Sequence, residues 1–113
     1  MTSSAFDIGI SGMRAASAQL NATAANVANV STSDYQPVDV AFREARAGDQ
    51  PAGVGYDYVT AQSFVSPTRP FLGGVDLATE MVDMMSARMQ FQASAMTVRA
   101  AVDMRRTLMD TFA

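Results

Sequence analysis

The sequence predicts a mainly α-helical fold in which long N- and C-terminal helices form a coiled-coil-like pair, joined by a short β-hairpin or irregular segment. All four prolines and five of the seven glycines lie between residues 37 and 74, which separates two stretches with helical periodicity. The apolar content of 49% comes mainly from Ala, Val and nine Met, with no Trp. That composition favours helices with small, adaptable contact residues over a core of large rings.

The 113 residues divide into three parts: an N-terminal helix with its turn over 1–35, a β-rich or extended segment over 36–74, and a C-terminal helix over 75–113. A chain of this length can hold a stable core, but not by a wide margin. Burial against neighbouring molecules would therefore contribute to its stability.

The first helix is predicted to begin at Ser4, which can cap it in a capping box with Asp7. Its apolar stripe consists of Phe6, Met13, Leu20 and Val27, seven residues apart, with Ile10 and Ala24 between them. This period near 3.5 is typical of a coiled-coil seam. Gly9 and Gly12 each cost roughly 1 kcal/mol of helix propensity, so we expect another backbone to come close there. The helix is predicted to end near Asn29, before a run of turn-forming residues.

The middle segment begins with a predicted strand in which Val38, Val40 and Phe42 alternate with polar or small residues. Residues 48–53 are typical of a loop, and residues 55–60 can return as a second strand to form a hairpin. Residues 64–71, interrupted by two prolines, are predicted to be an extended connection. Because a lone hairpin is marginal in water, we expect the helices or a neighbour to cover it.

The second helix is predicted to start after an N-cap at Asp76, with Glu80 in its first turn. Its stripe alternates in steps of four and three residues: Leu77, Met81, Met84, Arg88, Phe91, Ala95, Val98, Val102, Arg105, Met109 and Phe112. A helix over this span would be about 50 Å long, at 1.5 Å per residue. The first helix alone is too short to cover it.

The composition excludes several classes of function. The chain has no Cys, no His and no Lys, so the commonest metal ligands, the commonest general base and the Schiff-base nucleophile are missing. The net charge of −3, without a basic run, argues against nucleic acid as a partner. We expect no catalytic residue, no metal, no cofactor and no small-molecule substrate. No apolar stretch is long enough for a membrane span. The N-terminus lacks the features of a Sec signal peptide, so if the protein leaves the cytoplasm, we expect it to do so by another route.

Two clusters have a functional and a structural interpretation. Asp76, Glu80 and Asp83 could form a metal or acid–base site, but a capped helix start explains them better in a chain without His. The methionines of the second helix could form a soft-metal site, yet thioethers at helical spacing are far more often packing residues. A membrane-surface helix is disfavoured because the polar face lacks Lys and Arg richness. Physical reasoning alone therefore leads to a helical assembly protein.

Both ends of the chain resemble the flagellar rod and hook axial proteins. The N-terminal signature corresponds to Ser11-Gly12-Met13, Leu20, the element Ala25-Asn26-Val27-Ala28-Asn29, Thr32 and Tyr35. Asp34 replaces the usual glycine before the tyrosine, where a left-handed turn is expected. The C-terminal signature corresponds to residues 75–84, followed by Phe91-Gln92-Ala93, with Gly74 where the family commonly has Asn. Together the two matches cover about two-thirds of the chain.

The resemblance implies a structural subunit of the basal-body rod, whose terminal helices pair in the inner core of a helical polymer in the periplasm. The short middle segment is similar to that of proximal-rod members, which serve flagellum-dependent motility. The implied partners are other rod subunits, further copies of the chain and the flagellar type III export apparatus. The expected assembly interface comprises Phe6, Met13, Leu20, Asn26, Asn29, Leu77, Met81, Met84, Phe91, Val98 and Val102. The alternative is a secreted helical-hairpin interaction protein unrelated to flagella, and an enzyme is the least favoured interpretation.

Overall fold

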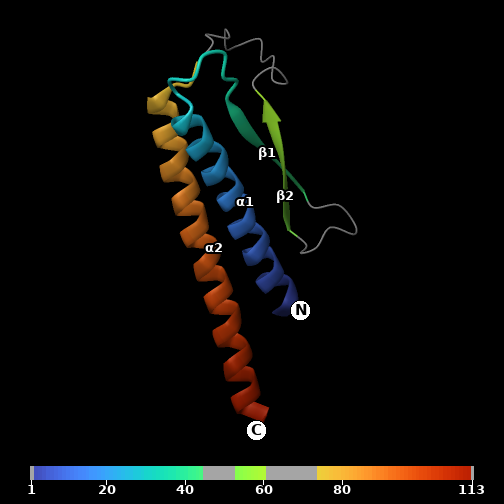
Figure 1. The fold of residues 1–113 in the computed structure, drawn as a ribbon. Coiled ribbons are helices and arrows are strands. Elements are labelled where there is room, and N and C mark those ends of the chain that lie inside the picture. The colour runs from blue at the N-terminus through green and yellow to red at the C-terminus, as the bar shows by residue number, and fades with distance from the viewer. Residues whose placement is uncertain (1, 45–52, 61–73, 113) are drawn as a thin grey trace.

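The computed structural model describes residues 2–44, 53–60 and 74–112. Its elements are α1 (Thr2–Ala28), β1 (Val38–Glu44), β2 (Val54–Thr60) and α2 (Leu77–Phe112). The molecule is elongated, with extents of 63 × 27 × 22 Å. α1 lies between α2 on one side and the β-hairpin on the other (Figure 1). The predicted fold class, two long paired helices with a small two-stranded sheet between them in sequence, is confirmed.

The C-terminal end of α1 is where the sequence placed it, but its start is not. α1 already begins at Thr2, so Ser4 lies inside the helix and the prediction that it is the cap was wrong. After Ala28, the Asn29 side chain donates to the carbonyl of Ala25 at 2.8 Å, and the Thr32 hydroxyl donates to Asn29 Oδ1 at 3.1 Å. Asp34 then has a φ of 60°, the left-handed turn expected at this position.

The hairpin pairs β1 with β2 in antiparallel register, with Val38 opposite Thr60 and Glu44 opposite Val54. Both predicted strands are confirmed, while the expected connection over 64–71 and most of the loop over 48–53 lie outside the described residues. Val40 is buried against Ala18 and Ala22 of α1, and Tyr56 packs onto the same cluster. The sheet is therefore covered by α1, as a hairpin of this size requires.

The start of α2 is capped by Asp76, as predicted. Its carboxylate accepts from the backbone N–H of Ala78 at 3.1 Å and from the Thr79 hydroxyl at 2.9 Å. From there α2 runs for 36 residues against the 27 of α1, about 54 Å at 1.5 Å per residue. Every side chain from Val102 to Phe112 is exposed, so the expectation that α1 cannot cover this helix is confirmed.

The contact between the helices is made by small residues. Ala16 and Ala87 are fully buried and Ala101 is nearly so, whereas no large side chain is completely buried among the described residues. On α2 the most buried side chains, Glu80, Ala87 and Ala101, belong to a row displaced by one residue from the Met81 to Val102 part of the predicted stripe. The tightest contact with α1 therefore lies one residue away from the predicted stripe, because small side chains let the backbones approach and large ones cannot enter the gap.

Candidate assembly site

The eleven residues expected at the assembly interface fall into three groups by burial. Asn26 is buried. Half-buried side chains are those of Phe6, Met13, Leu20, Asn29, Phe91 and Val98. The exposed side chains are those of Leu77, Met81, Met84 and Val102. The exposed set lies on one helix, α2, whereas Asn26 lies at the junction of three elements.

Asn26 joins α1 to β1 and to α2. Its Oδ1 accepts from the backbone N–H of Val38 at 2.8 Å and from the Tyr35 hydroxyl at 3.1 Å. Its Nδ2 donates to the Val38 carbonyl at 2.8 Å and to Glu80 Oε1 at 2.9 Å. Both donors and both acceptor positions of the amide are thus occupied. Towards Val38 the side chain behaves like a neighbouring strand, since it pairs with both the N–H and the C=O of one residue.

Glu80 is the acidic partner in this junction. It is only 9% exposed, and burial raises the pKa of its carboxyl above the ordinary value of 4.5. Hydrogen bonds from Asn26 and Thr23 lower the pKa, and the nearby charges of Asp83 and Asp39 raise it, so desolvation is the dominant cause. Glu80 lies in the first turn of α2, as predicted, but its carboxylate also forms a buried contact with the other helix, which was not predicted.

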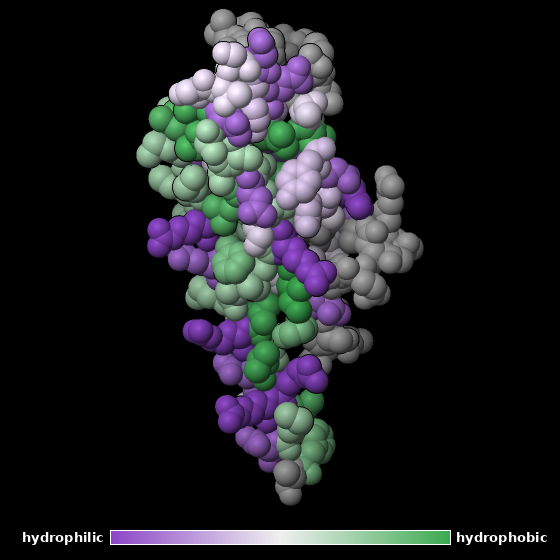
Figure 2. Space-filling model, in the orientation of Figure 1, coloured by the Kyte–Doolittle hydropathy of each residue, from purple (hydrophilic) through white to green (hydrophobic). Residues whose placement is uncertain are grey.

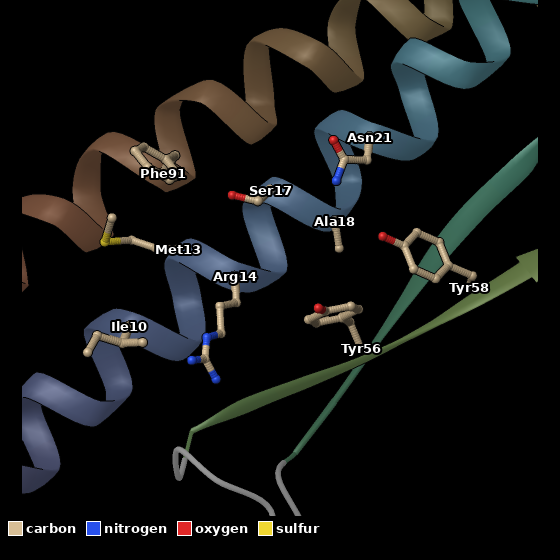
Figure 3. Close-up of a pocket in the computed structure, with 9 residues that line it drawn as sticks. All are labelled: Ile10, Met13, Arg14, Ser17, Ala18, Asn21, Tyr56, Tyr58 and Phe91. Atoms are coloured by element: carbon tan, nitrogen blue, oxygen red, sulfur yellow. The ribbon is translucent and has the colours of Figure 1, made fainter.

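A groove of about 340 Å³ runs along α1 on the side between α2 and β2 (Figure 3). Its floor is α1 and its walls are Phe91 on one side and two tyrosines of β2 on the other. The rings of Tyr56 and Tyr58 meet edge to face, with centroids 6.0 Å apart. The lining residues are Ile10, Met13, Arg14, Ser17, Ala18, Asn21, Tyr56, Tyr58 and Phe91. Met13 and Phe91, both from the predicted stripes, therefore lie at one surface.

Large hydrophobic side chains of α2 are exposed along its length. Met81, Val82, Met85, Met89 and Met96 each expose more than half of their surface, and Met109 and Phe112 continue this pattern to the end of the helix. Figure 2 shows hydrophobic patches from one end of the molecule to the other, interrupted by hydrophilic side chains. An apolar surface of this extent is typical of a protein that binds other protein molecules.

The described residues offer little else that carries chemistry. Within residues 2–44, 53–60 and 74–112, no group of three or more His, Cys, Asp or Glu is placed to hold a metal ion. None of the helices in this part of the chain is long and apolar enough to span a membrane.

The residues that make the helix contact were not among those predicted from the sequence. Ser94 and Ala101 lie in the same row of α2 as Glu80 and Ala87, at intervals of seven residues. Their spacing was visible in the sequence, but small and polar residues are weak signals of a seam. By contrast, the close approach expected at Gly9 and Gly12 is present, since a β-carbon on either would fall 2.5 Å from an atom of Val98 or Ser94.

Two protein-family models match the chain. Residues 6–36 match the family described as flagella basal body rod protein. Residues 73–111 match the family described as flagellar basal body rod FlgEFG protein C-terminal. The first match covers most of α1 and the turn that follows it, and the second covers nearly all of α2. No curated protein matches the chain.

Proposed function

Because the chain belongs to the flagellar basal body rod protein family, we propose that it is a proximal-rod subunit that polymerises through its terminal helices and supports flagellum-dependent motility. Family membership gives it a structural role in the basal body, in assembly with other rod proteins. The family is a structural one and not a family of enzymes. We propose in addition its proximal position, its role in motility, its polymerisation through the terminal helices and its route of export.

The observation that carries this proposal is the exposed apolar face of α2. The face includes Leu77, Met81, Met84 and Val102 from the expected interface. At about 25 cal/mol per Å² of apolar surface removed from water, covering such a face is a substantial driving force for association. Methionine side chains suit this use because they adapt to irregular partner surfaces.

The chain offers two different surfaces for contacts between neighbouring subunits. The exposed end of α2 and the groove along α1 are different surfaces. When two different surfaces of one molecule pair, the contact is heterologous and repeats into a helical filament unless a rotation closes it. Pairing of these two surfaces between neighbouring subunits would therefore build a polymer and not a simple two-fold dimer.

The short middle segment supports a proximal position. Only residues 36–74 separate the two family signatures, and the described part of this segment is a single hairpin packed on α1. Rod and hook proteins with larger outer domains carry longer insertions at this place, so the chain is similar to the FlgC type. The proposal includes export by the flagellar type III apparatus and a final location in the periplasmic rod.

The test is to delete the gene in its own bacterium and to restore it with an epitope-tagged copy. We expect the deletion to abolish swimming and rod formation, and the tag to appear by cryo-electron microscopy of purified basal bodies at the base of the rod. A tag in the distal rod or hook would contradict the proximal position. A tag absent from basal bodies, with normal swimming in the deletion strain, would contradict the rod function and favour the secreted interaction protein.

A further inference from the structure

The contact between α1 and α2 is made by small side chains that repeat every seven residues. Such a repeat would also allow the two helices to pack in alignments shifted by seven residues. On α2 the row facing α1 has Glu80, Ala87, Ser94 and Ala101 at intervals of seven. On α1 the glycines that approach this row are followed by Ala16, Thr23 and Asn26 on the same side. Since most of these side chains are small, sliding one helix by seven residues replaces one small contact by another. Packing alone therefore discriminates poorly between alignments.

The native alignment is defined by two sets of contacts. Gly12 lies against Ser94, and Asn26 lies against Glu80. In an antiparallel pair, sliding by seven residues would place Gly12 against Ala87 or against Ala101. One of these slips brings Glu80 towards Gln19, whose amide can donate a hydrogen bond. In both slips, however, the Nδ2 of Asn26 loses its carboxylate acceptor.

We infer that the buried hydrogen bond between Asn26 and Glu80 selects the alignment of α1 with α2. Glu80 thereby determines how much of α2 extends beyond α1 and stays exposed. This hydrogen bond is buried and 2.9 Å long, and it joins a side chain of α1 to a side chain of α2. A buried donor without an acceptor is penalised far more than an exchanged small-residue contact. A single polar residue at a seam position is the best-attested device for setting register in coiled coils.

The consequence reaches the surface proposed for assembly. A slip of seven residues moves α2 along α1 by about 10 Å, at 1.5 Å per residue. The same slip would shorten or lengthen the exposed segment from Val102 to Phe112. The chain would keep its helices but would present a different apolar surface to its neighbours.

The absence of Cys allows the alignment to be read by engineered disulfides in the full chain. Gly12→Cys with Ser94→Cys reports the native alignment, because a β-carbon at Gly12 would lie 3.3 Å from Ser94 Cβ, near the separation that a disulfide needs. Gly12→Cys with Ala87→Cys, or with Ala101→Cys, reports the two slips. Each pair is oxidised in dilute monomer, and the disulfides are mapped by mass spectrometry.

The decisive variant is Glu80→Ala, which makes the row on α2 uniform in size, and its matched control is Glu80→Gln, which keeps an acceptor for Asn26. We expect the native pair alone to close in the parent chain and in Glu80→Gln. In Glu80→Ala the fraction of molecules that form the disulfide of a slipped cysteine pair should rise by roughly tenfold or more. This is the effect expected when a buried donor has lost its acceptor. Circular dichroism should show unchanged helix content.

Two results would overturn the inference. The first is a Glu80→Ala chain that stays helical and closes only the native pair, which would mean that packing or the connecting segment sets the alignment. The second is a Glu80→Ala chain that loses its helices, which would make Glu80 a requirement for folding and not a selector between alignments. Neither result bears on whether the chain is a rod subunit, because the assay uses the monomer.

Discussion

Gly9 faces Val98 so closely that a β-carbon on Gly9 would lie 2.5 Å from Val98 Cγ2 and 3.3 Å from the backbone nitrogen of the same residue. The glycine is therefore the place where Val98 of α2 enters the surface of α1. This contact explains why a residue that weakens an isolated helix by about 1 kcal/mol is present in α1.

Gly9→Ala should destabilise the monomer. The gain in helix propensity of about 1 kcal/mol is opposed by overpacking against Val98 and the α2 backbone, which typically costs about 1–3 kcal/mol. We expect a lower urea midpoint with an unchanged slope. Gly12→Ala is the matched comparison: its close neighbours are side-chain atoms of Ser94, so its cost should fall when Ser94→Ala is added, whereas the cost of Gly9→Ala should not. Equal or higher stability of Gly9→Ala would show that the helices are further apart than described.

The two asparagines of the Ala-Asn-Val-Ala-Asn element should differ in their importance for stability. Asn26→Ala leaves both backbone groups of Val38 without their side-chain partner and removes one of the hydrogen-bond donors of Glu80. Buried polar groups without partners cost about 1–3 kcal/mol each, so we expect a loss of several kcal/mol in the free energy of unfolding. Asn29→Ala removes exposed hydrogen bonds only and should cost about 1 kcal/mol or less. Chemical denaturation of both variants measures the difference, and similar losses would contradict the central place of Asn26.

Much of the fold follows from local signals, and the helix contact does not. The cap at Asp76, the turn at Asp34 and the end of α1 each depend on a few neighbouring residues, so the sequence predicts them well. The contact between Asn26 and Glu80 joins residues 54 positions apart and depends on which faces of the helices meet. Apolar periodicity indicated the rows of large residues, but it cannot tell a face that packs inside the chain from one that packs against a neighbour. The small residues that pack inside carry little hydrophobic signal.

The raised pKa of Glu80 predicts a pH dependence of stability. Between 4.5, the ordinary value, and the higher pKa of the folded state, the folded chain holds a proton that the unfolded chain has released. Stability due to this group therefore falls as pH rises through that window, and the loss is complete above the folded-state pKa. Glu80→Gln removes the titration and keeps an acceptor for Asn26, so its stability relative to the parent chain should increase from pH 4 to pH 7.

Urea unfolding of both chains across this pH range measures the effect as a difference, which cancels the contributions of the other carboxylates. Asp83→Asn serves as the control. Asp83 contributes a charge that raises the pKa of Glu80, so this variant should reduce the pH dependence without abolishing it. If the difference in the free energy of unfolding between the parent chain and Glu80→Gln stays constant with pH, Glu80 is not desolvated in the folded chain.

The exposed face of α2 should be needed for assembly and not for folding. Met81 and Val102 are 57% and 46% exposed, so Met81→Gln with Val102→Gln should change the free energy of unfolding of the monomer by about 0.5 kcal/mol or less per site. Phe91 is less suitable as a probe because it is half-buried beside α1.

In a rod the loss of apolar contact recurs at every subunit, so the Met81→Gln and Val102→Gln double variant should be made and exported while basal bodies lack complete rods and cells fail to swim. Gln90→Ala, at an exposed polar position of the same helix, should swim normally. Complete rods in the double variant would show that this face of α2 is not the assembly surface.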